Sequence, residues 1–194
     1  MGTGVPVAVA WGLPAGVGPQ VWADSRPVAH PYGPAQQSAA GRRAAAEALA
    51  SAGSADRTVP READGRPRFP GGFAGSISHT ERWAVAVVVP GADAVGVDIE
   101  SGVVSARMAR FVLSERERRT LLGSPGGYTA RDLFAAKEAA FKAMSSTGAL
   151  GDLMFWRIEL RLEGAALTAR YRCELTPVWV RSEAGLSFAL AIRR

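Results

Sequence analysis

The stretch Phe134-Ala135-Ala136-Lys137-Glu138-Ala139-Ala140-Phe141-Lys142 is predicted to form part of a functional site. The chain has 23 lysines and arginines, and its only two lysines, Lys137 and Lys142, both lie in this window. A compact ammonium and a planar guanidinium differ in hydration, flexibility and hydrogen-bonding geometry. Because every other basic position of this kind is arginine, the presence of lysine at these two positions indicates a functional role for them. We expect both lysines to belong to one site.

This window is predicted to lie on a helix that Thr129 caps and that continues to about Met144. Glu138 is four residues after Phe134 and three before Phe141, so its carboxylate is expected on or beside the buried side of the helix. The alternative is an ordinary exposed Glu–Lys pair at i,i+4 spacing, which contributes roughly 0.2–0.5 kcal/mol.

A second acidic motif, Gly96-Val97-Asp98-Ile99-Glu100, lies about forty residues earlier and is predicted to end a strand. Strand alternation places Asp98 and Glu100 on one face, about 7 Å apart. Two desolvated carboxylates at that spacing repel each other unless a cation lies nearby. Oxygen ligands alone favour Mg²⁺ or Mn²⁺ over zinc. The alternative, a strand that simply ends in solvent, stays open on this pattern.

Three further segments carry groups that can bind anions. Arg42 lies early in an alanine-rich helix predicted over residues 36–52, and Arg66 lies in a loop rich in glycine and proline. Ser78 and His79 precede a buried strand predicted over residues 83–89. Each also has an ordinary interpretation, as a solvated arginine or as a histidine bonded to the backbone at a turn.

The remaining pattern predicts an α+β fold. A strand is expected over residues 5–11, a capping box at Ser114 predicts a helix to Leu122, and residues 155–192 alternate as in an antiparallel sheet. The turn over residues 90–93 predicts a hairpin between strands 83–89 and 94–100.

Composition limits the function classes. The single cysteine, Cys173, excludes an internal disulfide, suits a reducing cytosol and is expected in the core. The first 18 residues are a poor signal peptide, and no apolar run reaches the roughly 20 residues of a membrane helix. We therefore expect a cytoplasmic protein without membrane contact. The net charge of +5 predicts an acidic partner, either a nucleic acid, an anionic cofactor or an acidic protein.

Four of these motifs in register resemble the 4'-phosphopantetheinyl transferases, in the single-chain branch that activates peptide and polyketide synthetases, including siderophore synthetases. They are Gly41-Arg42, Gly65-Arg66-Pro67, the segment Gly75–Thr80, and the pair formed by 96–100 and 137–142. The resemblance implies two similar α/β lobes related by a pseudo-twofold axis, with coenzyme A in the cleft between them. The division would fall near residue 92, giving lobes 1–92 and 93–194.

By this resemblance, the enzyme transfers 4'-phosphopantetheine from coenzyme A to a serine of an acidic acyl or peptidyl carrier protein and releases 3',5'-ADP. The enzyme is expected to be a monomer. The implied Mg²⁺ (or Mn²⁺) ligands are Asp98, Glu100 and Glu138, and Glu138 is the candidate base for the serine proton. The implied coenzyme A contacts also include basic and hydroxyl side chains, namely Arg42, Arg66, Ser78, His79 and Lys142.

Two other classes stay open on the sequence. A nucleic-acid-binding module would explain the charge, although the arginines are scattered and no DNA or RNA motif is present. A metal-dependent nucleotide phosphohydrolase would use the same carboxylates with water in place of serine.

Overall fold

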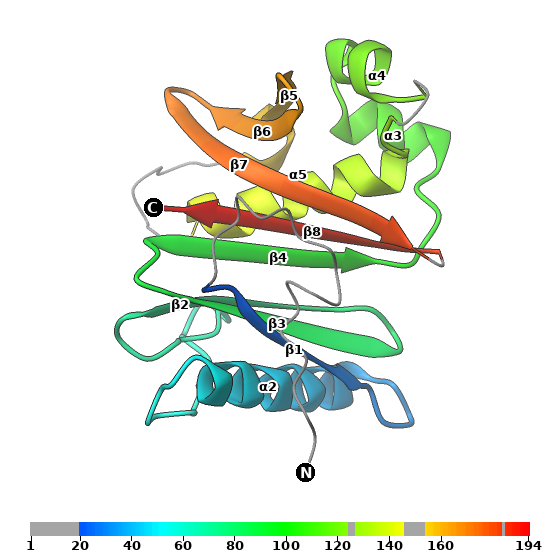
Figure 1. Cartoon of the computed structure of the whole chain (residues 1–194). Coiled ribbons are helices and arrows are strands. Elements are labelled where there is room, and N and C mark those ends of the chain that lie inside the picture. Colours follow the sequence, from blue (N-terminus) through cyan, green and yellow to red (C-terminus); the bar gives the residue numbers. More distant parts are fainter. Residues whose placement is uncertain (1–19, 124–126, 146–153, 184) are drawn as a thin grey trace. The chain divides into compact units, whose positions relative to one another are not determined.

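The structure is a computed structural model that describes residues 20–123, 127–145, 154–183 and 185–194. Within these ranges the chain forms two compact units, one ending at Val95 and one comprising Gly96–Arg193. Both units combine a β-sheet with helices, so the predicted α+β class is confirmed (Figure 1). The strand predicted over residues 5–11 lies outside the described residues.

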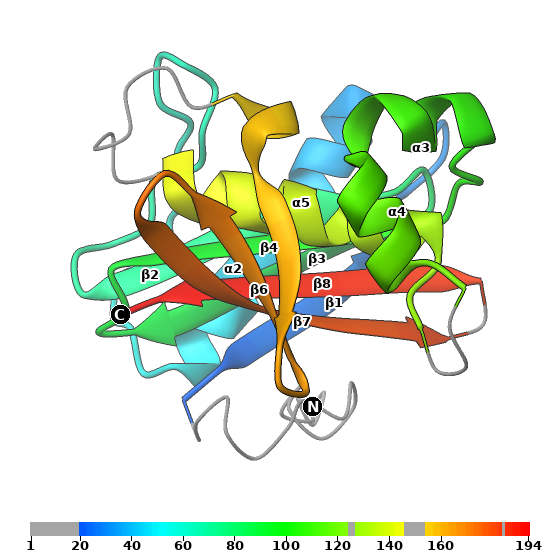
Figure 2. The ribbon, with the colours of Figure 1, turned by 90° about the horizontal axis from the view of Figure 1, so that it is seen from above.

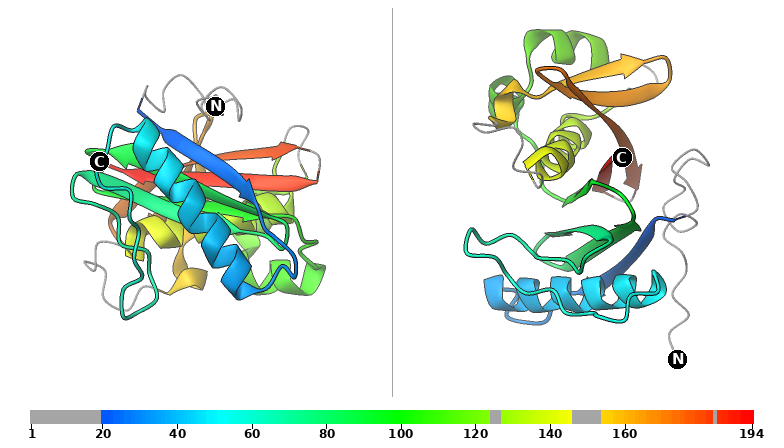
Figure 3. Two further views of the ribbon diagram at one scale, coloured as in Figure 1. Left: turned by 90° about the horizontal axis from the view of Figure 1, so that it is seen from below. Right: turned by 90° about the vertical axis from the view of Figure 1, so that its left-hand side faces the viewer.

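The first unit is a three-stranded antiparallel sheet with one helix on it. Its described elements are β1 (Trp22–Pro27), α2 (Pro34–Ser51), β2 (Phe73–His79) and β3 (Trp83–Pro90). β3 lies in the middle and pairs with both β1 and β2. Figure 3 shows α2 lying across one face of this sheet.

The α2 helix matches its prediction because local signals agree along its length. Pro34 stands at its start, alanines fill its interior, and Gly53 follows its end with a φ of +84°. Small side chains let the helix approach the sheet closely. A Cβ on Gly41 would lie only 2.7 Å from Cγ2 of Ile77 on β2.

The predicted hairpin between strands 83–89 and 94–100 is wrong. β3 already has β1 and β2 as its neighbours, whereas β4 (Ala94–Glu100) pairs with β8 in a different sheet. The turn after Pro90 is present, since Gly91 has a φ of +70°. A tight turn signal specifies a change of chain direction, but it does not specify the pairing partner of the next strand.

The second unit contains a five-stranded sheet in the order β4-β8-β7-β6-β5. After β4 come α3 (Ala106–Val112), α4 (Glu115–Leu121), α5 (Ala130–Ser145) and a 3₁₀ helix (Phe155–Arg157). The strands β5 (Glu159–Glu163), β6 (Ala166–Tyr171), β7 (Glu174–Glu183) and β8 (Leu186–Arg193) then form an antiparallel meander. Figure 2 shows α5 running along this sheet, where it packs on β8 and β7.

The helix caps of the second unit confirm the sequence prediction. Ser114 and Glu117 form a reciprocal capping box at the start of α4. Thr129 Oγ1 accepts from the N–H of Asp132, and Asp132 Oδ2 accepts from the N–H of Thr129, at 3.2 and 2.8 Å. Cys173, in contrast, is exposed in the turn between β6 and β7, so its predicted place in the core is wrong.

Candidate active site

Within the second unit, the end of β4 and the second half of α5 meet through one ion pair. Lys142 Nζ on α5 donates to Asp98 Oδ1 at 2.6 Å and to the carbonyl oxygen of Val97 at 2.9 Å. The Asp98 side chain is 6% exposed and that of Lys142 is 30% exposed, so the pair lies at the boundary between core and surface. The strand motif and the helix motif of the sequence are therefore in direct contact.

A glycine makes this meeting possible. A Cβ built on Gly96 would lie 1.9 Å from the carbonyl oxygen of Ala139 and 2.7 Å from the nitrogen of Ala143. Real side-chain carbons do not approach so closely, so only glycine lets β4 lie directly against the α5 backbone. Gly96 thus sets the distance between the carboxylates of the strand motif and the carboxylate of Glu138 on the helix.

Two of the three predicted carboxylates, Glu100 and Glu138, have pKa values that are shifted by burial and by the charges around them. Burial raises the pKa of Glu138, and the charge of Asp98 raises this pKa further, while Lys142 partly opposes both effects. Burial likewise raises the pKa of Glu100, followed by repulsion from Asp98 and Glu138. Three carboxylates therefore share a neighbourhood in which Lys142 alone does not offset their repulsion.

Such a neighbourhood suits a hard divalent cation, because all three side chains offer oxygen donors. In the described part of the chain, however, no three His, Cys, Asp or Glu side chains are already arranged as a metal-binding group. Asp98 is instead bonded to Lys142. The carboxylate oxygens are donors of the type that Mg²⁺ prefers. To bind one ion, however, the side chains of Asp98, Glu100 and Glu138 would have to rearrange and come together.

The expectation that both lysines lie in this site is wrong for Lys137. Its side chain is 1% exposed and points into the core, where Nζ donates to the Val112 carbonyl oxygen at 2.7 Å and to Glu117 Oε2 at 3.0 Å. Lys137 and Lys142 are five residues apart on the helix, and at about 100° per residue their side chains leave the helix in directions about 140° apart, so they need not share a site. Only Lys142 joins the carboxylates.

The roles of one charged residue near the site and of one in the core were missed by sequence reasoning. Arg131 lowers the pKa of Glu100 against the effects of burial and its acidic neighbours, and its Nε donates to Ser187 Oγ at 2.8 Å. Arg131 lies two turns before Glu138, and this seven-residue spacing was a usable signal. Glu117 was assigned only to a capping box, although it also binds Lys137.

The first unit has a separate groove of about 440 Å³ beside the start of α2. Arg42 and His79 both line it, together with Arg61, which the sequence pattern did not indicate. Pro34 and Gln37 from the first turn of α2 also line it. The positive end of a helix dipole and basic side chains therefore face one concave surface that suits an anion.

Arg66 and Ser78 are not among the described residues that line this groove. Arg66 Nε donates to Asp64 Oδ2 at 2.6 Å, and the neighbours Gly65 and Pro67 line the groove instead. Ser78 is buried and alternates with His79 along β2, so it belongs to the opposite face of that sheet. The phosphate contacts expected of these two residues stay predictions.

Comparison with known proteins identifies the family. Residues 35–89 match the family model described as the 4'-phosphopantetheinyl transferase N-terminal domain. Residues 94–192 match the family model of the 4'-phosphopantetheinyl transferase superfamily, which thus covers half of the chain. The chain belongs to the 4'-phosphopantetheinyl transferase superfamily.

Two curated relatives are similar to part of the chain. Enterobactin synthase component D of Salmonella typhimurium is 38% identical over 112 residues, which are 55% of this chain and 46% of that protein. The protein of the same name from Salmonella typhi is 39% identical over 112 residues, with the same coverage. The matched region thus spans about half the length of these relatives.

Among the described residues, no helix combines the length and apolar character that a membrane span needs.

Proposed function

We propose that the chain transfers the 4'-phosphopantetheine group of coenzyme A to a serine of an apo acyl or peptidyl carrier protein. The serine oxygen forms a bond to the β-phosphorus of coenzyme A, and the bond from that phosphorus to the bridging oxygen breaks. The products are the holo-carrier protein and 3',5'-ADP, and the serine proton passes to a base on the enzyme.

The observation that carries this proposal is the ion pair between Lys142 and Asp98, with Glu138 and Glu100 within electrostatic reach. Phosphoryl transfer requires charge neutralisation and positioning more than a covalent nucleophile on the protein. Here carboxylates and an ammonium are held on a strand end and a helix that touch backbone to backbone at Gly96. Membership of the superfamily supports the same chemistry.

Each residue of this site has a proposed role. Asp98, Glu100 and Glu138 would hold Mg²⁺ or Mn²⁺. When bound, the ion would neutralise charge on the diphosphate. Glu138 is also proposed as the base that takes the serine proton, since a carboxylate at this site can accept it. Lys142 would neutralise charge on the phosphoryl group being transferred or on the leaving phosphate.

The groove of the first unit would bind the other anionic part of coenzyme A. His79 and Arg42, which line the groove, are proposed to contact the 3'-phosphate, and Arg61 adds a third positive or polar contact there. Arg66 and Ser78 are proposed to contribute further phosphate contacts, which for Arg66 requires release from Asp64. The net charge of +5 suits both this anionic co-substrate and an acidic carrier protein.

The direct test is to incubate the chain with coenzyme A, Mg²⁺ and an apo peptidyl carrier protein and to follow the carrier by mass spectrometry. The expected result is a gain of one phosphopantetheine group with stoichiometric release of 3',5'-ADP, and loss of the reaction with a chelator. Release of phosphopantetheine from coenzyme A without carrier would favour a phosphohydrolase. Binding of nucleic acid in low salt with no product at all would favour a nucleic-acid-binding module.

A matched pair of variants links the activity to the site. Glu138→Gln is expected to abolish the mass gain, because it removes both a metal ligand and the candidate base. Glu115→Gln is the control, since Glu115 is an exposed glutamate on α4 whose contact to Arg119 spans 3.9 Å. Equal rates for Glu138→Gln and wild type would refute the assignment of this site.

A further inference from the structure

The second unit contains a buried ion pair for which the proposed chemistry has no use. Lys137 and Glu117 are each 1% exposed. Lys137 is the bulkiest fully buried side chain among the described residues. A buried charge pair is costly to desolvate, and apolar residues of similar volume often serve stability equally well. The pair therefore calls for an explanation beyond filling the core.

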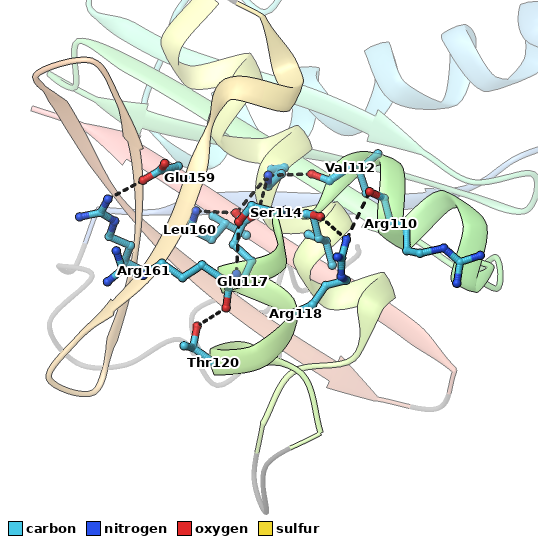
Figure 4. A network of polar contacts seen from close by, with 12 residues as sticks. Arg110, Val112, Ser114, Glu117, Arg118, Thr120, Glu159, Leu160 and Arg161 are labelled. Atoms are coloured by element: carbon cyan, nitrogen blue, oxygen red, sulfur yellow. Dashed lines mark hydrogen bonds and ion pairs between the residues drawn. The ribbon is translucent and has the colours of Figure 1, made fainter.

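Both members of this ion pair have hydrogen-bond partners for their polar atoms. An ammonium has three donors, and Lys137 Nζ has three acceptors, at 2.7 Å to the Val112 carbonyl and at 3.0 Å to each carboxylate oxygen of Glu117. Glu117 also accepts from the backbone N–H groups of Ser114 at 2.6 Å and Leu160 at 2.7 Å. Figure 4 shows the contacts of Glu117 with Ser114 and Leu160. A planar guanidinium would not reproduce this compact three-acceptor arrangement, which explains a lysine in a chain otherwise rich in arginine.

The network ties α5 to three other elements. Val112 ends α3, Ser114 caps α4 and Leu160 belongs to β5, so one ammonium on α5 is anchored to all three. On another side of the helix, β4 presses against the α5 backbone at Gly96. These two contacts together restrict rotation of α5 about its own axis.

Rotation of α5 matters because Glu138 follows Lys137 directly and Lys142 lies one turn further on. A helix with its side chains has a radius of about 5–6 Å, so a rotation of about 10° displaces a side-chain tip by about 1 Å. A displacement of that size at a reacting group can reduce catalysis about 100-fold. The direction of Lys137 thus sets the direction of the residues in the candidate active site.

We propose that Glu117 and Lys137 are positioning residues, whose buried ion pair fixes the rotation of α5 and so holds Glu138 and Lys142 against the Asp98 end of β4. This inference rests on the proposed function for its kinetic consequences, although its structural consequence is independent of that function. Neither residue is assigned a contact with substrate.

The test uses three variants and one stability-matched control. Glu117→Gln keeps a capping side chain at its position, and Lys137→Met removes the ammonium but keeps a long apolar chain. The double variant removes both charges, so it leaves no unpaired buried ion and should regain thermal stability relative to Lys137→Met. The control is Asp132→Asn, which weakens a different polar cluster of α5 around Ser182 and Ser187.

Assays run at a temperature where circular dichroism shows every variant folded. We expect kcat to fall at least about tenfold in the single variants and to stay low in the double variant, while KM for coenzyme A changes less than about threefold. Asp132→Asn should lower the unfolding temperature but retain most of kcat. A kcat that simply follows the unfolding temperature across all four variants would overturn the proposal.

A crystal structure of the double variant gives a readout that does not depend on turnover. The expected result is a rotated α5 in which the contact between Lys142 Nζ and Asp98 Oδ1, 2.6 Å in the wild type, is lost. An unchanged contact would overturn the proposal even if the enzyme is active. Failure of the wild type to modify any carrier would instead count against the proposed function and leave this structural result to decide the inference.

Discussion

Gly96→Ala is the substitution whose effect follows most directly from the geometry. The added Cβ would lie 1.9 Å from the Ala139 carbonyl oxygen, whereas ordinary contacts begin at 3.4 Å, so β4 and α5 must separate by about 1.5 Å. The obstacle is backbone and cannot rotate away, so we expect a cost of about 3 kcal/mol, at the upper end for overpacking. For a chain of this size that lowers the unfolding temperature by about 6–12 °C.

The same separation moves Asp98 away from Lys142 and Glu138, and a shift of this size should reduce carrier modification by at least about 100-fold. Thermal unfolding and the carrier mass assay measure the two effects. Gly102→Ala is the matched control, because nothing lies within 4 Å of where its Cβ would be, and both measurements should stay near wild type. Near-normal activity and stability in Gly96→Ala would refute the close packing of β4 on α5.

Three further predictions test other parts of the structure. Lys142→Met should reduce kcat about 10²–10³-fold in the carrier assay, because Asp98 loses its ammonium partner and the transferred group loses a positive charge. Burial would raise the pKa of Asp132, but hydrogen bonds from Ser182, Ser187 and Thr129 outweigh burial and hold this pKa below its usual value. The stability that Asp132 contributes is therefore fully present above the pKa that Asp132 has in the unfolded chain. It is lost as the pH falls through the pKa of the folded protein. In urea unfolding, the free energy of unfolding of the wild type should fall between about pH 7 and about pH 3. In Asp132→Asn this fall should be smaller by about 1–3 kcal/mol, and an equal fall in both proteins would contradict the assignment. In Gly41→Ala the added Cβ would lie 2.7 Å from Cγ2 of Ile77 beside the groove. This substitution should therefore weaken coenzyme A binding in calorimetry and lower the free energy of unfolding by about 1–3 kcal/mol. Unchanged values of both quantities would contradict that packing.

The elements that the sequence predicted well are those specified by local signals. The capping residues Ser114 and Thr129 mark helix starts, and the alanine-rich run before Gly53 marks a helix and its end. The acidic strand motif and the helix motif were predicted to share a site, and the contact between Asp98 and Lys142 joins them. Local signals were sufficient for the helix boundaries, whereas the joining of the two motifs was implied by the family resemblance.

The parts that the sequence did not predict depend on tertiary partners. Nothing local shows that Lys137 turns inward to Glu117, twenty residues earlier, while Lys142 turns to β4. The turn at Gly91 did not show that β4 leaves the sheet of β3 and pairs with β8. Similarly, the adjacent residues Ser78 and His79 were grouped as one phosphate-binding motif, although strand alternation sends them to opposite faces.

The central claim, that acidic side chains from β4 and α5 bind one divalent ion, is tested most directly by calorimetric titration of Mg²⁺ in the presence of coenzyme A. Wild type, Asp98→Asn, Glu138→Gln and the double variant form a complete cycle. Each single variant should weaken Mg²⁺ binding, and the double variant should be much less affected than the sum of the two, because residues that share one ion are coupled. Unchanged Mg²⁺ affinity in the single variants, or strictly additive losses, would contradict the claim.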